Sequence, residues 1–112
     1  MASIDLAQVT KDVLGAMTTA IGSGSGQVHA FARAEASKIA VSIAEIGQLR
    51  AAGVIDEEEM ELHLDVQKNA SRAVLMAVKG IGIVTAERAV NAAISVALAA
   101  VSTSLGVPFV RV

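Results

Sequence analysis

The chain has 112 residues, a formal net charge of −2 and nine scattered lysines and arginines. A nucleic-acid interface would need a clustered basic surface, so nucleic-acid binding is disfavoured. It has no cysteine, which excludes disulfides and thiolate metal sites. Hydrophobic residues make up 54% of the sequence but aromatic residues only 2%, so we expect one domain with a core of small aliphatic side chains. Such a core buries little area per residue, which predicts further burial against copies of the chain or against a partner.

The first predicted helix covers residues 4–21, with Ser3 or Asp5 as its N-cap. The residues before and around it, MASIDLAQVTKD, lack a basic stretch followed by an apolar run, so we expect no secretory signal and a soluble form. The stretch GSGSG at 22–26 predicts a connector. Apolar residues recur along this helix at three- and four-residue intervals, namely Leu6, Val9, Val13, Met17 and Ile21.

The second predicted helix covers residues 27–52 and carries a ladder of alanines at every fourth position. Such a ladder offers a shallow surface on which another helix can lie close, so we expect it to form a helix–helix interface. The ladder consists of Ala32, Ala36, Ala40 and Ala44. A separate stripe is predicted to face solvent and consists of Glu35, Lys38, Ser42 and Glu45.

The acidic stretch GVIDEEEMELHLDVQ at 53–67 is interpreted as a helix start rather than a catalytic carboxylate cluster. Gly53 suits the left-handed residue after the second helix. Asp56 and Glu59 have the spacing of a capping box, and Ile55 and Met60 that of a hydrophobic staple. A loop of about four residues predicts an antiparallel hairpin with the second helix.

The third predicted helix covers residues 57–79 and has one narrow polar face, which is acidic early and basic late as the helix dipole prefers. This charged stripe consists of Glu58, Glu61, Asp65, Lys68, Arg72 and Lys79. The rest of its circumference is apolar and includes Met60, Leu62, Leu64, Val66, Val74, Ala77 and Val78.

The stretch KGIGIVTAERAV at 79–90 allows two interpretations. In the favoured one, Gly80 and Gly82 end the third helix and Thr85 caps a fourth that covers 85–104. In the other, the third helix runs on to Leu105 over roughly 73 Å, a length that only an assembly could cover.

The fourth predicted helix carries a second small-residue ladder, which we expect to form another helix–helix interface: Ala89, Ala93 and Ala97. The stretch 89–110 is uncharged and long enough to span a membrane, but its polar residues and helical periodicity favour a bundle helix. The tail, 106–112, is predicted to be extended and to be docked, because its apolar residues, Phe109 and Val110 among them, would otherwise be left in water. It can dock on its own bundle or on a neighbouring subunit, and the small-residue core favours the neighbour.

Candidate chemical sites are few. His63, Glu59 and Glu45 can be drawn as a metal site across the predicted hairpin, but the Glu-x-x-His motif of di-iron bundles is absent. A half-buried, hydrogen-bonded histidine is therefore the favoured interpretation of His63. Neither GSGSG nor GIG fits a phosphate or dinucleotide loop. We expect no catalytic site, cofactor, metal or small-molecule substrate.

The sequence therefore predicts an all-α, antiparallel bundle of four helices in one domain, 1–112, followed by an extended tail. The expected function is that of a non-enzymatic, self-assembling structural or adaptor subunit that acts through its small-residue interfaces, with no nucleic-acid partner. One alternative is a membrane-active helical protein of the pore-forming or holin-like kind. Another is a ferritin-like metal binder that uses carboxylates and histidine.

Overall fold

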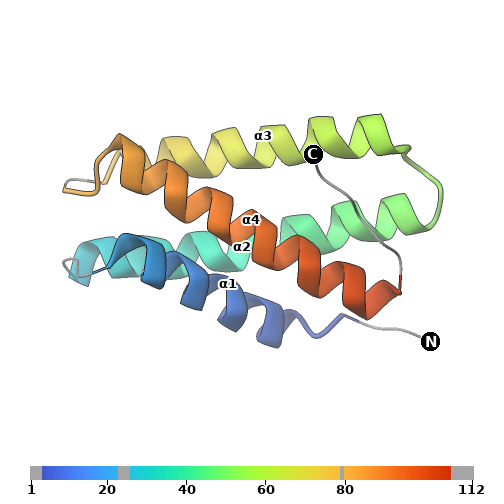
Figure 1. Ribbon diagram of the computed structural model, residues 1–112, viewed down its shortest axis with the longest axis horizontal. Helices are drawn as coiled ribbons and strands as arrows, with labels where there is room; N and C mark the ends of the chain where they lie inside the picture. The colour runs from blue at the N-terminus through green and yellow to red at the C-terminus, as the bar shows by residue number, and fades with distance from the viewer. Residues whose placement is uncertain (1–3, 23–25, 79, 107–112) are drawn as a thin grey trace.

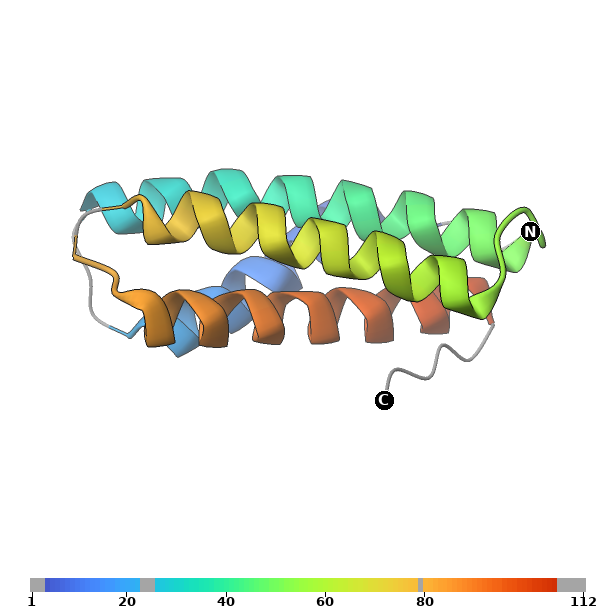
Figure 2. The same ribbon diagram turned by 90° about the horizontal axis from the view of Figure 1, so that it is seen from above.

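The computed structural model describes residues 4–22, 26–78 and 80–106, which form four helices. These are α1 (Leu6–Ile21), α2 (Gly26–Ala51), α3 (Glu57–Met76) and α4 (Ile83–Leu105). Consecutive helices run in opposite directions and lie side by side (Figures 1 and 2). The predicted antiparallel four-helix bundle is confirmed.

The bundle has two central and two peripheral helices. α2 and α4 contact each other, and each also contacts α1 and α3. Across the described residues α1 and α3 do not meet, and Figure 1 shows them on opposite sides of the central pair. α1 and α3 therefore each rest against α2 and α4 and have an outer side that no other helix covers.

Small side chains form a large part of the buried sides of the two central helices. The alanine ladders of α2 and α4 are buried, and the described core contains no aromatic side chain, because Phe31 is exposed. Alanine keeps the side-chain layer between two helices thin, so a helix packed on either ladder can come closer than leucine would permit. We call the two buried ladders together the alanine seam. The larger fully buried residues of the core include Met17, Ile39, Ile43, Met60, Leu64 and Leu75.

The predicted helix starts of α1 and α3 are confirmed. Asp5 caps α1 by accepting a hydrogen bond from Gln8 N at 3.2 Å. At α3, Asp56 Oδ1 accepts from Glu59 N at 2.8 Å, and Glu59 Oε1 accepts from Asp56 N at 3.1 Å, which completes a capping box. Helix-start physics therefore accounts for Asp56 and Glu59 in the acidic stretch.

The break between α3 and α4 is confirmed, so the single long helix is wrong, but the predicted cap is wrong too. α3 ends at Met76 and α4 begins at Ile83, with Gly82 rather than Thr85 at the N-cap. Gly80 and Gly82 have φ values of 94° and 77°, where glycine is favoured. Since the chain becomes helical directly after Gly82, Thr85 lies inside the first turn.

Several predictions at the chain ends and connectors fall outside the described residues. α4 closes at Gly106, which has a left-handed φ of 68° as expected of a helix stop. Phe109, Val110 and the proposed docking of the tail lie beyond it, among residues 107–112. Ser3, most of the GSGSG connector and Lys79 lie outside the described part as well.

Candidate functional site

The two alanine ladders lie inside the single chain. All seven alanines are buried, and all but Ala44, at 5%, have no exposed surface. Their close packing therefore serves the bundle itself, and their use between subunits stays a prediction that would require the bundle to open. The seven residues are Ala32, Ala36, Ala40, Ala44, Ala89, Ala93 and Ala97.

The outer side of α3 differs from the sequence-based expectation. Leu62 and Val66 were expected on the covered part of this helix, yet they are 62% and 69% exposed. The reason is topological, since α3 contacts only α2 and α4 and these cover one narrow stripe of it. The buried residues of α3 are Met60, Leu64, Ser71 and Leu75.

The exposed residues of α3 follow a regular pattern. Their spacing alternates between four and three residues, as in the seam of a two-helix coiled coil. At 100° per residue they lie on the side of the helix opposite its buried stripe. We call this set the α3 outer face, and it consists of Leu62, Val66, Asn69, Ala73 and Met76, all exposed.

Charged residues border the α3 outer face along one edge. Glu58, Asp65 and Arg72 follow one another at seven-residue intervals, so they lie in line beside the apolar seam. Arg72 Nη1 lies 2.9 Å from Glu87 Oε1 of α4, and both side chains remain partly exposed. The edge is therefore negative in the first half of the helix and positive in the second.

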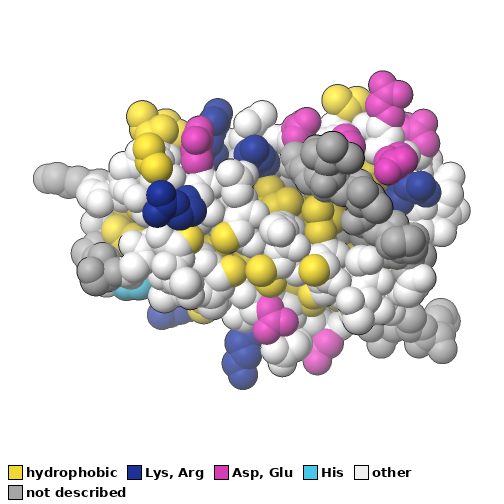
Figure 3. All heavy atoms as spheres, viewed as in Figure 1, with side chains coloured by type: hydrophobic (Ala, Val, Ile, Leu, Met, Phe, Trp, Pro, Cys, Tyr) yellow, Lys and Arg dark blue, Asp and Glu magenta, His cyan; other side chains and the backbone are white. Residues whose placement is uncertain are grey.

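Exposed apolar side chains also lie beyond both ends of α3. Val54 precedes the helix and is 66% exposed, while Ile83 and Val84 open α4 and are 61% and 67% exposed. Figure 3 shows hydrophobic side chains standing out at both ends of the upper edge, which α3 and the first turn of α4 form. Exposed apolar side chains are therefore present at each end of α3 as well as along it.

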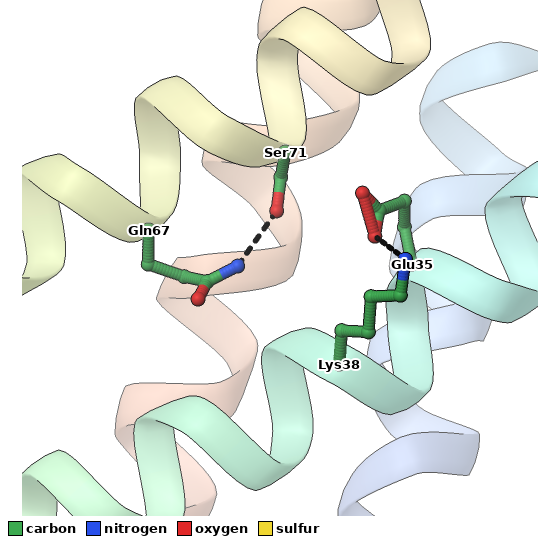
Figure 4. A network of polar contacts seen from close by, with 4 residues as sticks. All are labelled: Glu35, Lys38, Gln67 and Ser71. Atoms are coloured by element: carbon green, nitrogen blue, oxygen red, sulfur yellow. Dashed lines mark hydrogen bonds and ion pairs between the residues drawn. The ribbon is translucent and has the colours of Figure 1, made fainter.

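A buried polar cluster lies on the opposite, covered side of α3. Glu35 of α2 is only 3% exposed and Ser71 of α3 only 1%. Gln67 Nε2 donates to Ser71 Oγ at 2.8 Å, and Lys38 Nζ lies 3.8 Å from Glu35 Oε2 (Figure 4). Figure 4 places the Glu35 carboxylate on the side of α2 that faces Ser71.

Glu35 was expected in the solvent-facing stripe of its helix, and that expectation is wrong. α2 is central and contacts all three other helices, so its buried side is wider than one narrow stripe and includes Glu35. Burial raises the pKa of the Glu35 carboxyl above its ordinary 4.5, and the Lys38 ammonium lowers it in part. Because Glu35 Oε2 has no hydrogen-bond partner, the protonated acid suits this position better than the ion.

The candidate metal ligands do not form a site in the described part of the chain. Glu45, Glu59 and His63 are all exposed, and no three acidic or histidine side chains come together there as a group that could hold an ion. Glu59 is engaged in the capping box. The prediction of a half-buried His63 is wrong, because none of the other described helices covers the outer half of α3.

α4 is long and apolar enough to cross a membrane, judged by length and composition alone. In the bundle one side of this helix is turned into the core. Core helices and membrane spans can have the same length and apolar composition, so these two properties do not distinguish them. The buried side of α4 consists of Ala86, Ala89, Val90, Ala93, Ile94, Ala97, Leu98 and Val101.

Comparison of the chain with protein-family models, with curated proteins and with solved structures finds no match. Function must therefore be argued from the geometry of this chain. Two features are not explained by the packing of the four helices: the exposed apolar residues of the α3 outer face and the buried carboxyl of Glu35. The first offers a contact surface, and the second affects how the stability of the bundle responds to pH.

Proposed function

We propose that this protein is a non-enzymatic helical subunit that acts by binding copies of itself. The observation that carries the proposal is the α3 outer face, where Leu62 and Val66 are 62% and 69% exposed at coiled-coil spacing. Burying a leucine or valine side chain contributes about 1.5–3 kcal/mol. A helix partner on this face would supply that burial.

The composition of the interior supports the same proposal. A core rich in alanine and without aromatic residues in its described part gains less from burial than an average core of equal size. Association adds buried area that the single chain lacks, and it stabilises the folded subunit by mass action. In this proposal the alanine ladders build the subunit and the larger exposed side chains join it to its copies.

Solution mass tests the proposal directly. Light scattering coupled to size exclusion, run over a range from micromolar to millimolar protein, should give a mass above the 11.4 kDa of one chain, rising with concentration. Circular dichroism on the same fractions should report a helical protein. A helical species of 11.4 kDa at every concentration would overturn self-association.

A second candidate function is membrane activity, and α4 is the observation that favours it. A helix of 23 residues that is apolar enough to span would have to turn its buried side toward lipid, which requires the bundle to open. Flotation with phosphatidylcholine–phosphatidylglycerol vesicles, together with release of a trapped dye, tests this candidate. Protein that stays at the bottom of the gradient and releases no dye would contradict it.

A further inference from the structure

We infer that two copies of this protein pair through their α3 outer faces, antiparallel and about a twofold axis that passes close to Asn69. The inference rests on the proposed self-association and specifies its surface and geometry. The occupant of the α3 outer face is then the same face of a second copy. A twofold contact of this kind is self-complementary, so each residue pair occurs twice.

The spacing of the α3 outer face suits a helix of the same kind. Leu62, Val66, Asn69, Ala73 and Met76 alternate at four and three residues, so they stay on one side of the helix. With the axis near Asn69, Leu62 of one copy lies level with Met76 of the other, and Val66 lies within one residue of the level of Ala73. The two Asn69 side chains lie near the axis, and a polar residue at one seam position fixes register.

Charge complementarity selects the antiparallel orientation. Asp65 and Arg72 lie on the same edge of the face, on opposite sides of the position of the axis. An antiparallel pair therefore places Asp65 of each copy beside Arg72 of the other. Arg72 already pairs with Glu87, but a guanidinium carries five N–H donors and is 39% exposed here, so it can engage a second carboxylate.

A parallel arrangement would oppose these charges. It would bring the acidic first turns of two copies together, where Glu57, Glu58 and Glu59 stand at the positive end of one helix dipole. The antiparallel arrangement separates these turns by the length of α3, which is about 30 Å for its 20 residues.

The exposed apolar residues beyond the two ends of α3 are placed so that the same twofold axis brings opposite ends of the two copies together. Val54 lies at one end and Ile83 and Val84 at the other, and all three are more than half exposed. A twofold axis near the middle of α3 carries the Val54 end of one copy toward the Ile83–Val84 end of the other. The contact thereby extends beyond a single helix, toward the roughly 800 Å² per partner that stable dimers bury.

A charge-swap experiment tests the geometry. In the antiparallel dimer, D65R places an arginine beside Arg72 of the other copy at both symmetry-related contacts. R72E places a glutamate beside Asp65 of the other copy at the same two contacts. Each variant alone should have a dimer Kd at least about tenfold above wild type, whereas an equimolar mixture should recover dimers, because both contacts then pair opposite charges. Mixed dimers that form no better than either variant alone would overturn the antiparallel register.

Cross-linking gives an independent test, because the chain contains no cysteine. Position 69 lies next to the twofold axis, so mild oxidation should convert the N69C variant to a disulfide-linked dimer. The matched control is V41C, at an exposed position on α2 away from this face. It should remain uncrosslinked under the same conditions, and equal cross-linking of the two variants would contradict the assigned surface.

A third comparison separates failure of the surface from failure of self-association. The double variant L62E/V66E should have the mass of one chain at concentrations where wild type and the control V41E are associated, and all three should be equally helical. If wild type is associated and L62E/V66E is too, the α3 outer face is the wrong surface although the proposed function stands. If wild type has the mass of one chain, both are overturned.

Discussion

The alanine seam of α2 and α4 and the α3 outer face are both regular stripes, but the first is buried in the bundle and the second is exposed. The seam consists of alanines with almost no exposed surface, whereas Leu62 and Val66 on the outer face are largely exposed. α2 and α4 each contact all three other helices, whereas α3 contacts two of them and keeps one covered side. The uncovered side of α3 includes a leucine and a valine, which would gain more from a partner than alanines would.

The largest expected effect comes from enlarging a seam residue. A36L adds three carbons at a position with no exposed surface, on a ladder whose side chains are all alanine. Overpacking of this kind should lower the free energy of unfolding by about 1–3 kcal/mol, measured by urea denaturation. Leucine and alanine have similar helix propensities, so packing is the main variable.

The matched control for the seam is A99L, because Ala99 lies on the exposed side of α4. This variant should change the free energy of unfolding by no more than about 0.5 kcal/mol. Equal effects of A36L and A99L would show that the seam tolerates larger residues. The contrast between the two stripes would then not be one of packing.

The next effect concerns Glu35, on the covered side of α3. Its raised pKa means that the folded state holds the proton more tightly than the unfolded chain does, so this carboxyl favours folding below pH 4.5 and that contribution is lost as pH rises above this value. E35Q keeps the shape without the charge. At pH 7 it should raise the free energy of unfolding by about 1–2 kcal/mol.

The test of this prediction is the difference in unfolding free energy between E35Q and wild type, followed from pH 4 to pH 7. The difference should grow with pH, because wild type alone loses stability as Glu35 ionises. E45Q is the matched control, since Glu45 is exposed on the same helix. A pH-independent difference for E35Q would mean that the burial of this carboxyl does not govern its ionisation.

Local signals in the sequence predicted the parts of the fold that depend on neighbours along the chain. The capping box of Asp56 and Glu59 and the glycine at position 53 act within a few residues, so spacing alone reveals them. The break before α4 was predicted for the same reason. The cap at Thr85 failed because Gly82 already turns the chain and the helix begins directly after it.

The two features of the candidate site depend instead on which helices become neighbours. Glu35 follows the period of a solvent-facing stripe, but α2 contacts three other helices, and periodicity does not specify how many neighbours a helix has. Leu62 and Val66 follow the period of a covered stripe, but none of the helices in the described part of the chain covers them. A pattern tells which residues favour burial, whereas the packing decides whether one chain provides it.

A smaller effect tests how α3 is held in place. D56A removes the N-cap acceptor of the Glu59 amide and should lower the free energy of unfolding by about 1 kcal/mol. E57A, one position later, removes a first-turn charge without a capping hydrogen bond, so its effect should be a few tenths of a kcal/mol. A D56A effect as small as that of E57A would mean that packing of the inner side alone fixes the start of α3.

The smallest expected effect on the single chain belongs to the α3 outer face. L62Q changes a side chain that the bundle leaves 62% exposed, so at the lowest protein concentrations it should alter the free energy of unfolding by less than about 0.5 kcal/mol.

If self-association buries this face, the melting temperature of wild type should rise with protein concentration, because association stabilises the folded subunit. That rise should be weaker in L62Q, while V41Q, at an exposed position on α2, should behave like wild type. Melting curves recorded over a hundredfold range of concentration measure both quantities at once. A large loss of stability at low concentration would mean that Leu62 already contributes to the single bundle, and the contrast between the seam and the outer face would disappear.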